Sequence, residues 1–199
     1  MQEQTSSKVV VIGASAGGLN ALISLFSLVP GDFPYPILIV QHTSPYQESL
    51  LPEILGKRTK LKVFEAEDKM EILPGNIYTA PPNYHLLSET PNTLALSSDD
   101  KVNYSRPSID VLFESAALVY GKNATGIILS GANNDGAEGL VRIKEAGGIT
   151  IAQDPQTAEF PMMPQSAIDT GAIDYIFTIE EIAHFLGIKK IAIQRKEEI

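Results

Sequence analysis

The sequence predicts an α/β fold: a doubly wound, mostly parallel sheet with helices on both faces and an inserted antiparallel β-hairpin. Two observations predict the sheet and its helices. Short apolar runs recur along the chain, and amphipathic stretches of helical period separate them. A third observation predicts the hairpin, since two strand-like stretches, 84–88 and 93–97, flank a Glu-Thr-Pro-Asn turn. No linker or internal repeat interrupts the pattern, so we expect one domain over residues 1–199.

The first half of the chain opens with an apolar run over 9–12, a glycine-rich turn over 13–18 and a helical pattern that begins at Leu19. A break at 30–33 separates this helix from residues 36–41, whose continuous apolar run is typical of a strand buried on both faces. The remaining elements expected before the hairpin are a helix over 51–58 and strands over 61–65 and 75–79.

The second half returns to regular alternation of helices and strands. Gly147-Gly148 is typical of a helix end, and Thr178-Ile-Glu-Glu181 matches a capping box at a helix start. The expected helices cover 108–120, 136–146, 164–170 and 179–186, and the expected strands cover 124–129, 149–152 and 175–177. The charged end, 194–199, is expected to be frayed.

Composition excludes several classes of protein. The net charge of −9 repels phosphate backbones, so nucleic acid is not expected as a partner. The chain has no cysteine, which excludes disulfides and thiolate metal sites. The polar N-terminus does not match a signal peptide and no apolar run is long enough to span a bilayer, so we expect a cytoplasmic protein that is not membrane-inserted.

Three polar residues follow predicted strands that should be neighbours. Ser15 follows the first strand, His42 closes the second, and Asp135 lies just beyond the strand over 124–129. Ligands of such sheets bind at the carboxyl ends of the strands, so these side chains can meet at one edge. This convergence is the main argument from the residues for a catalytic site.

Ser15 lies in Gly13-Ala-Ser-Ala-Gly17, which fits the G-x-S-x-G pattern of a nucleophile on a strand-to-helix turn. An alternative is that the turn only caps the helix, with Ser15 as the N-cap residue. A dinucleotide-binding turn is a further alternative, but it needs a second glycine where Ser15 stands and an acidic residue where Gln41-His42 ends the strand.

A serine hydroxyl needs a neighbouring base, and His42 is the only histidine at a predicted strand end. His85 in the hairpin and His184 on the last helix are expected to be structural or exposed. The base in turn needs an acceptor that fixes its tautomer, a role that Asp135 could fill, although Asp before Gly is also common in turns and N-caps. The order Ser, His, Asp differs from that of the α/β-hydrolase fold.

Several motifs in this order resemble the CheB-type protein-glutamate methylesterases of bacterial chemotaxis. The resemblance runs from about Lys8 to Leu186 and rests on the following segments: Ile12-Gly-Ala-Ser-Ala-Gly-Gly18, Gln41-His42, Tyr78-x-Ala-Pro81, Arg106-Pro-Ser-Ile-Asp110, Leu129-Ser-Gly-x-x-x-Asp-Gly136 and Ile151-Ala-Gln153. It implies Ser15 as nucleophile, His42 as base and Asp135 as the residue that orients it. It also implies hydrolysis of glutamate methyl esters on chemoreceptor helices with release of methanol, deamidation of glutamine in some members, and no metal or organic cofactor.

The sequence departs from the family pattern near the predicted site. Chemotaxis members commonly have Thr where this chain has Ala16, and Met-Gly where it has Ala132-Asn133. These changes leave open a second hypothesis, a catalytically degenerate domain that binds receptors or other signalling proteins. Family members also commonly carry a receiver domain, whereas about eight residues precede the first predicted strand, so neither that domain nor its autoinhibition is expected here. The oligomeric state is left open.

Overall fold

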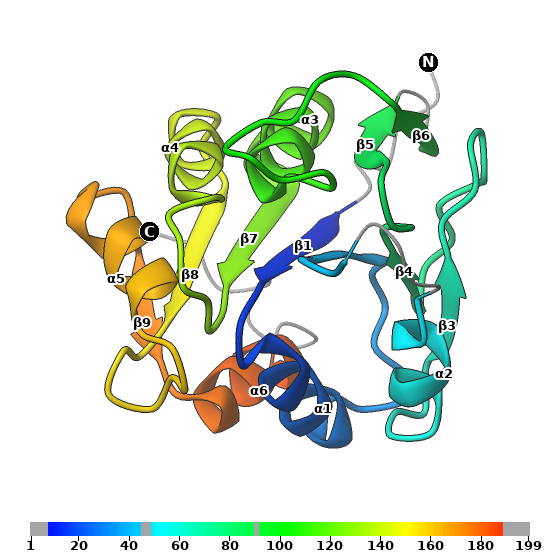
Figure 1. Cartoon of the computed structure of the whole chain (residues 1–199). Coiled ribbons are helices and arrows are strands. Elements are labelled where there is room, and N and C mark those ends of the chain that lie inside the picture. Colours follow the sequence, from blue (N-terminus) through cyan, green and yellow to red (C-terminus); the bar gives the residue numbers. More distant parts are fainter. Residues whose placement is uncertain (1–7, 45–48, 90–91, 189–199) are drawn as a thin grey trace, which may run out of the picture.

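A seven-stranded, wholly parallel sheet forms the centre of the computed structural model, which describes residues 8–44, 49–89 and 92–188 (Figure 1). The strand order is β3-β4-β2-β1-β7-β8-β9. The strands are β1 (Val9–Ala14), β2 (Ile37–Gln41), β3 (Lys62–Glu65), β4 (Asn76–Thr79), β7 (Ala124–Ile128), β8 (Ile149–Gln153) and β9 (Tyr175–Phe177). The sheet is therefore wound outward in both directions from β1, as the doubly wound prediction requires.

Helices cover both faces of the sheet and enclose two apolar layers (Figure 1). The helices are α1 (Gly18–Leu28), α2 (Leu51–Gly56), α3 (Ile109–Tyr120), α4 (Ala137–Glu145), α5 (Met162–Asp169) and α6 (Ile179–Ile188), with a 3-10 turn at Gly121–Asn123. Side chains of α1, α2 and α6 lie in one layer, and those of α3, α4 and α5 lie in the other. The central strands β1, β2 and β7 are buried along their whole length, which explains their uninterrupted apolar sequences.

The antiparallel hairpin is confirmed, and it forms a separate two-stranded sheet from β5 (His85–Glu89) and β6 (Thr93–Ser97). It packs beside α3 and does not extend the central sheet.

The capping box at α6 is also confirmed, since the Thr178 N–H donates to Glu181 Oε2 at 2.8 Å and the Glu181 N–H donates to Thr178 Oγ1 at 3.3 Å.

The prediction was wrong in detail at several element ends. Strand β1 continues through Gly13 and Ala14, which still pair with Val40 and Gln41. Helix α5 begins two residues earlier than predicted, at Met162, because its first turn is secured by the Met163 N–H donating to the Gly131 carbonyl at 2.9 Å. N–H groups in the first turn of a helix have no acceptor within the helix, so proline is tolerated there. Pro164 therefore indicates that the start of the helix is near but does not fix its first residue. The predicted fraying of residues 194–199 lies outside the described residues.

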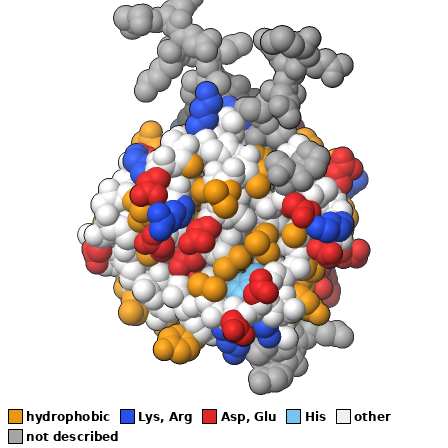
Figure 2. Space-filling view, turned by 90° about the horizontal axis from the view of Figure 1, so that it is seen from above, with side chains coloured by type: hydrophobic (Ala, Val, Ile, Leu, Met, Phe, Trp, Pro, Cys, Tyr) orange, Lys and Arg blue, Asp and Glu red, His pale blue; other side chains and the backbone are white. Residues whose placement is uncertain are grey.

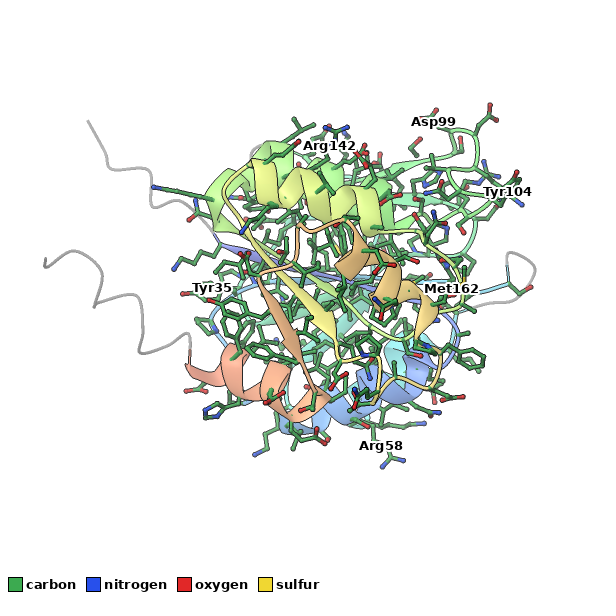
Figure 3. The ribbon with its side chains drawn as sticks, turned by 90° about the vertical axis from the view of Figure 1, so that its left-hand side faces the viewer. Tyr35, Arg58, Asp99, Tyr104, Arg142 and Met162 are labelled. Carbon is green, nitrogen blue, oxygen red and sulfur yellow. The ribbon has the colours of Figure 1, made fainter. Side chains whose placement is uncertain are left out.

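The carboxyl ends of the central strands form one edge of the molecule. Figure 3 shows the exposed Tyr104 and Met162 on this side.

Figure 2 shows the face above α3 and α4, where acidic, basic and hydrophobic side chains are interspersed. On it, Arg142 pairs with Glu138 at 2.9 Å and with Glu145 at 3.1 Å. No helix among the described residues has both the length and the apolar character needed to cross a bilayer.

Candidate active site

Ser15 lies directly after β1, half-buried, on a turn held by backbone hydrogen bonds. Its N–H donates to the Ser130 carbonyl at 3.0 Å, and its carbonyl accepts the Gly18 N–H at 2.9 Å. The N-cap of α1 is Gly17, with φ of 70°, so the alternative that Ser15 is the N-cap residue is wrong. A Cβ atom on Gly17 would lie 2.7 Å from Ser130 Oγ, which explains the glycine at this left-handed position.

The three predicted residues meet at the carboxyl edge of the sheet. His42 Nδ1 lies 3.2 Å from Ser15 Oγ, and His42 Nε2 lies 2.8 Å from Asp135 Oδ2. The Asp135 side chain is fully buried, whereas that of His42 is 13% exposed. In the tautomer that satisfies both contacts, Nε2–H donates to Asp135 and the Nδ1 lone pair accepts the Ser15 hydroxyl proton. This arrangement is chemically suited to activating a serine for attack on a carbonyl.

The Asp135 carboxylate is held at the N-terminal end of α3. It accepts the N–H groups of Ile109 at 2.7 Å and Asp110 at 3.1 Å, and the Ser108 hydroxyl at 2.9 Å. Burial alone would raise the pKa of Asp135, but the hydrogen bonds from His42 and from the Ile109 N–H outweigh it and hold the pKa below its usual value. Asp135 is therefore ionised at neutral pH.

A second buried carboxylate, Asp110, lies behind the first and holds the start of α4. It accepts the N–H groups of Gly136 at 2.9 Å and Gly139 at 2.7 Å. Burial raises the pKa of Asp110 to about 6; the charge of Asp135 adds to this rise, and the Gly139 N–H opposes it. Asn103 joins the two carboxylates, since its Nδ2 lies 2.6 Å from Asp110 Oδ2 and 3.3 Å from Asp135 Oδ1.

Sequence reasoning missed the roles of Ser108, Asp110 and Asn103. Ser108 and Asp110 belong to a motif that carried the family resemblance, but helical periodicity alone gives no reason for polar residues at a buried helix start. Asn103 lies in a loop with no recognisable pattern. Their contacts all depend on α3 and α4 approaching the end of β7, which is a tertiary arrangement.

The other two histidines lie where the sequence predicted. His85 is buried, and its Nδ1 accepts the Ser108 N–H at 3.1 Å while its Nε2 lies 3.0 Å from the Asp100 carbonyl oxygen. It therefore supports the start of α3 and does not reach the Ser15 hydroxyl. His184 is exposed on α6.

Gln41 ties the nucleophile to the base. Its Nε2 donates to the Ser15 carbonyl at 2.8 Å and to the His42 carbonyl at 3.0 Å. Its buried Oε1 has no hydrogen-bond partner within the described ranges. Gln41 is another residue of the candidate site to which the sequence analysis gave no role, although the pair Gln41-His42 contributed to the resemblance.

One of the residues that depart from the family pattern, Asn133, lies beside the catalytic base candidate. Asn133 Nδ2 lies 3.4 Å from His42 Nδ1, the nitrogen that faces Ser15, and Asn133 Oδ1 accepts the Asp135 N–H at 3.1 Å. The Gly131 N–H is occupied by the Phe160 carbonyl at 3.0 Å. Within residues 8–44, 49–89 and 92–188, the N–H groups of Ala16, Gly17 and Ala132 have no protein acceptor.

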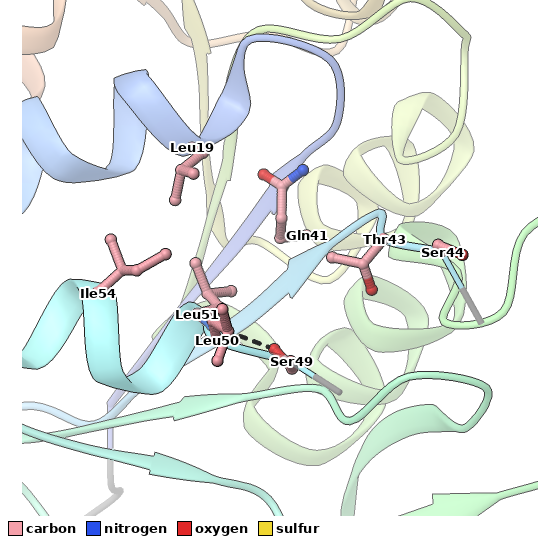
Figure 4. A pocket seen from close by; sticks show the side chains of 8 residues that line it. All are labelled: Leu19, Gln41, Thr43, Ser44, Ser49, Leu50, Leu51 and Ile54. Carbon is pink, nitrogen blue, oxygen red and sulfur yellow. Dashed lines mark hydrogen bonds between the residues drawn. The ribbon is translucent and has the colours of Figure 1, made fainter. Parts of the chain in front are cut away.

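A pocket of about 260 Å³ lies beside the nucleophile, between α1 and α2 (Figure 4). Leu19 and Ile54 face each other across it (Figure 4), and Gln41, whose Nε2 donates to the Ser15 carbonyl, also lines it. The lining side chains are those of Leu19, Gln41, Thr43, Ser44, Ser49, Leu50, Leu51 and Ile54.

In the part of the chain that the structure describes, no group of three His, Cys, Asp or Glu side chains is placed to hold a metal ion.

Comparison with known proteins points to one family. The family model described as CheB methylesterase matches residues 10–186. A putative protein-glutamate methylesterase/protein-glutamine glutaminase of Leptospira interrogans is 49% identical over 176 residues, covering 88% of this chain and 91% of that protein. A protein-glutamate methylesterase/protein-glutamine glutaminase of Nitrosomonas europaea is 41% identical over 182 residues, and there the chain spans about half (51%) of the relative's length.

The fold is also similar to a solved structure. The crystal structure of the Thermotoga maritima CheB methylesterase catalytic domain matches with a TM-score of 0.88 and 37% sequence identity, covering 92% of this chain and 98% of that one.

Proposed function

The chain belongs to the CheB methylesterase family, and on that premise we propose that it hydrolyses methyl esters of glutamate side chains on chemoreceptor proteins, with Ser15, His42 and Asp135 as its catalytic triad. The hydrogen-bonded series from Ser15 through His42 to Asp135 is the observation that carries this proposal. The names of the relatives also support deamidation of glutamine side chains. The chemistry agrees, because a glutamate methyl ester and a glutamine amide give the same acyl-enzyme when a serine attacks them.

The reaction runs through two acyl transfers. Ser15 Oγ attacks the ester carbonyl while His42 Nδ1 takes the hydroxyl proton, and Asp135 stabilises the imidazolium that forms. His42 then gives the proton to the departing methoxy oxygen, so methanol leaves and a glutamyl ester of Ser15 remains. Water attacks this ester with His42 again as base, and His42 then returns the proton to Ser15 Oγ, so the receptor leaves with a glutamate carboxylate and the serine hydroxyl is restored.

Backbone N–H groups are the candidate donors for the oxyanion of both tetrahedral intermediates. Those of Ala16, Gly17 and Ala132 have no protein acceptor in the described ranges, and they lie on the two loops that border Ser15. The N-terminal end of α1 adds a favourable dipole. In other hydrolases the loss of one such donor costs about 3–4 kcal/mol in the barrier, so this term is large.

The test is methanol release from a methylated chemoreceptor, measured for the wild type, Ser15→Ala and the control Ser27→Ala. Ser27 is an exposed serine on α1 that donates to the Ser24 carbonyl, remote from His42. Ser15→Ala should lower turnover by at least about three orders of magnitude and abolish labelling by a fluorophosphonate probe, whereas Ser27→Ala should retain both. Normal turnover by Ser15→Ala would overturn the serine mechanism.

A second candidate function is receptor binding without catalysis. The observation that favours it is Asn133, whose amide lies near the His42 nitrogen that must accept the Ser15 proton. A folded wild type that binds the methylated receptor but releases no methanol would establish this alternative.

A further inference from the structure

A tight turn over residues 102–105 stands beside His42. The Val102 N–H donates to the Ser105 carbonyl at 3.2 Å, and the Ser105 N–H donates to the Val102 carbonyl at 2.9 Å. The two central residues are both left-handed, with φ of 50° at Asn103 and 62° at Tyr104. Asn tolerates this conformation, whereas a bulky residue such as Tyr is rarely found in it, so the turn is held there by its surroundings.

Two anchors hold the turn. Asn103 is bonded to the carboxylates of Asp110 and Asp135, so one end of the turn is tied to the catalytic network. Arg106 secures the other end, since its guanidinium donates to Asn83 Oδ1 at 2.8 Å and to the Ser98 carbonyl at 2.7 Å. Asn103 therefore fixes the turn to Asp135, the same carboxylate that orients His42.

Tyr104 itself contributes little to this arrangement. Its side chain is 97% exposed, and no hydrogen bond of the described residues involves its hydroxyl. Figure 3 shows it projecting from the edge of the molecule at the carboxyl ends of the strands. Tyr104 thus has an unfavourable backbone conformation, and packing of its exposed ring does not compensate for it.

Tyr104 lines a small pocket together with the base, His42. This pocket measures about 110 Å³, and His42, Thr43 and Tyr104 are among the residues that line it. Sites for whole small molecules usually measure about 300–1,000 Å³, so this pocket suits only the end of one side chain. His42 connects this pocket to Ser15, so a polypeptide whose esterified side chain reaches Ser15 passes close to the turn where Tyr104 is exposed.

We propose that Tyr104 is a specificity-determining residue that contacts the polypeptide flanking the ester, and that Asn103 positions it by joining the turn to Asp110 and Asp135. The inference rests on the proposed function. Aromatic side chains supply much contact area with little loss of conformational freedom, which is why Tyr is common among the residues that dominate protein interfaces.

The experiment compares two substrates for each variant: a methylated chemoreceptor, and 4-nitrophenyl acetate, an activated ester that carries no flanking polypeptide. Tyr104→Ala should raise KM for the receptor by about 5- to 30-fold, the range of an interface residue of this kind, while kcat stays within about threefold. Hydrolysis of 4-nitrophenyl acetate should be unchanged, and Tyr104→Phe should retain wild-type KM. The control is Leu118→Ala, which removes another large side chain, 88% exposed, from α3.

Each outcome decides the proposal. An unchanged KM for the receptor in Tyr104→Ala would overturn it, and so would an equal loss on both substrates, because that pattern indicates a structural role. Unchanged hydrolysis of the small ester also serves as the check that the variant is folded. Failure of the proposed function would be distinct, since the wild type itself would then release no methanol from the receptor.

Discussion

The two sides of the candidate site are built in different ways. On the carboxylate side, Asp135 and Asp110 are buried and each accepts several hydrogen bonds, including backbone N–H groups at the starts of α3 and α4. On the nucleophile side, Ser15 is half-buried, and among the described residues its hydroxyl is hydrogen-bonded to His42 alone. The loops around it leave N–H groups of Ala16, Gly17 and Ala132 without acceptors in the described part of the chain.

This difference separates stability from reactivity. Polar groups that are buried and fully bonded stabilise one arrangement, because losing any partner leaves another buried group unsatisfied. Groups that lack partners cost stability but can bind charge that develops during a reaction. The carboxylate side is thus expected to affect both folding and turnover when it is mutated, and the nucleophile side mainly turnover.

The largest expected effect is that of Asp135→Asn, compared with Ser15→Ala. An amide at position 135 would place an NH₂ group among donors that now point at a carboxylate, so the unfolding free energy should fall by about 2–4 kcal/mol. Loss of the correct His42 tautomer should lower turnover by about three to four orders of magnitude. Ser15→Ala should change the unfolding free energy by less than about 1 kcal/mol. Urea unfolding and methanol release measure both quantities, and equal stability losses in the two variants would contradict the comparison.

The fold could be predicted from the sequence because its signals are local. The apolar runs, the capping box at Thr178 and the turn between β5 and β6 are each formed by residues that are neighbours in the sequence. The meeting of Ser15, His42 and Asp135 could also be predicted, since strand ends converge in a parallel sheet. The support for Asp135 could not, because it joins residues such as Asn103 and Ile109 that meet only when α3 packs against the end of β7. The left-handed turn at Asn103 and Tyr104 contains no glycine, so it had no sequence signal.

A smaller effect concerns the pH dependence of stability on the carboxylate side. Because burial raises the pKa of Asp110 to about 6, above its ordinary value of 3.8, the folded chain holds this proton more tightly than the unfolded chain. Its contribution to stability is therefore fully present below about pH 4 and is lost as the pH rises through about 6. Relative to Asp110→Asn, which does not titrate, the wild type should gain on the order of 2 kcal/mol as the pH falls from 7 to about 4.

The matched control for this pH dependence is Asp174→Asn, which should show the opposite slope. Burial would raise the pKa of Asp174, but the hydrogen bonds from Lys144 and Thr150 outweigh it and lower the pKa. The contribution of Asp174 is therefore present above its ordinary pKa and is lost as the pH falls. Urea unfolding at several pH values between about 2 and 7 tests both variants, and curves parallel to that of the wild type would contradict the assignment for Asp110.

The smallest effect tests whether Asn133 restrains the nucleophile side. Its amide lies 3.4 Å from His42 Nδ1, so it competes weakly with Ser15 for the lone pair that must accept the hydroxyl proton. A contact this long is worth less than an ordinary hydrogen bond of about 1 kcal/mol, so Asn133→Gly should raise turnover by only about two- to fivefold. Asn133→Asp should lower turnover, because a carboxylate beside Nδ1 favours a proton on the nitrogen that must be free. Asn134→Gly removes an exposed neighbouring amide as the control. Methanol release from all three variants decides the matter, since equal rates for Asn133→Gly and Asn133→Asp would show that His42 does not sense this side chain.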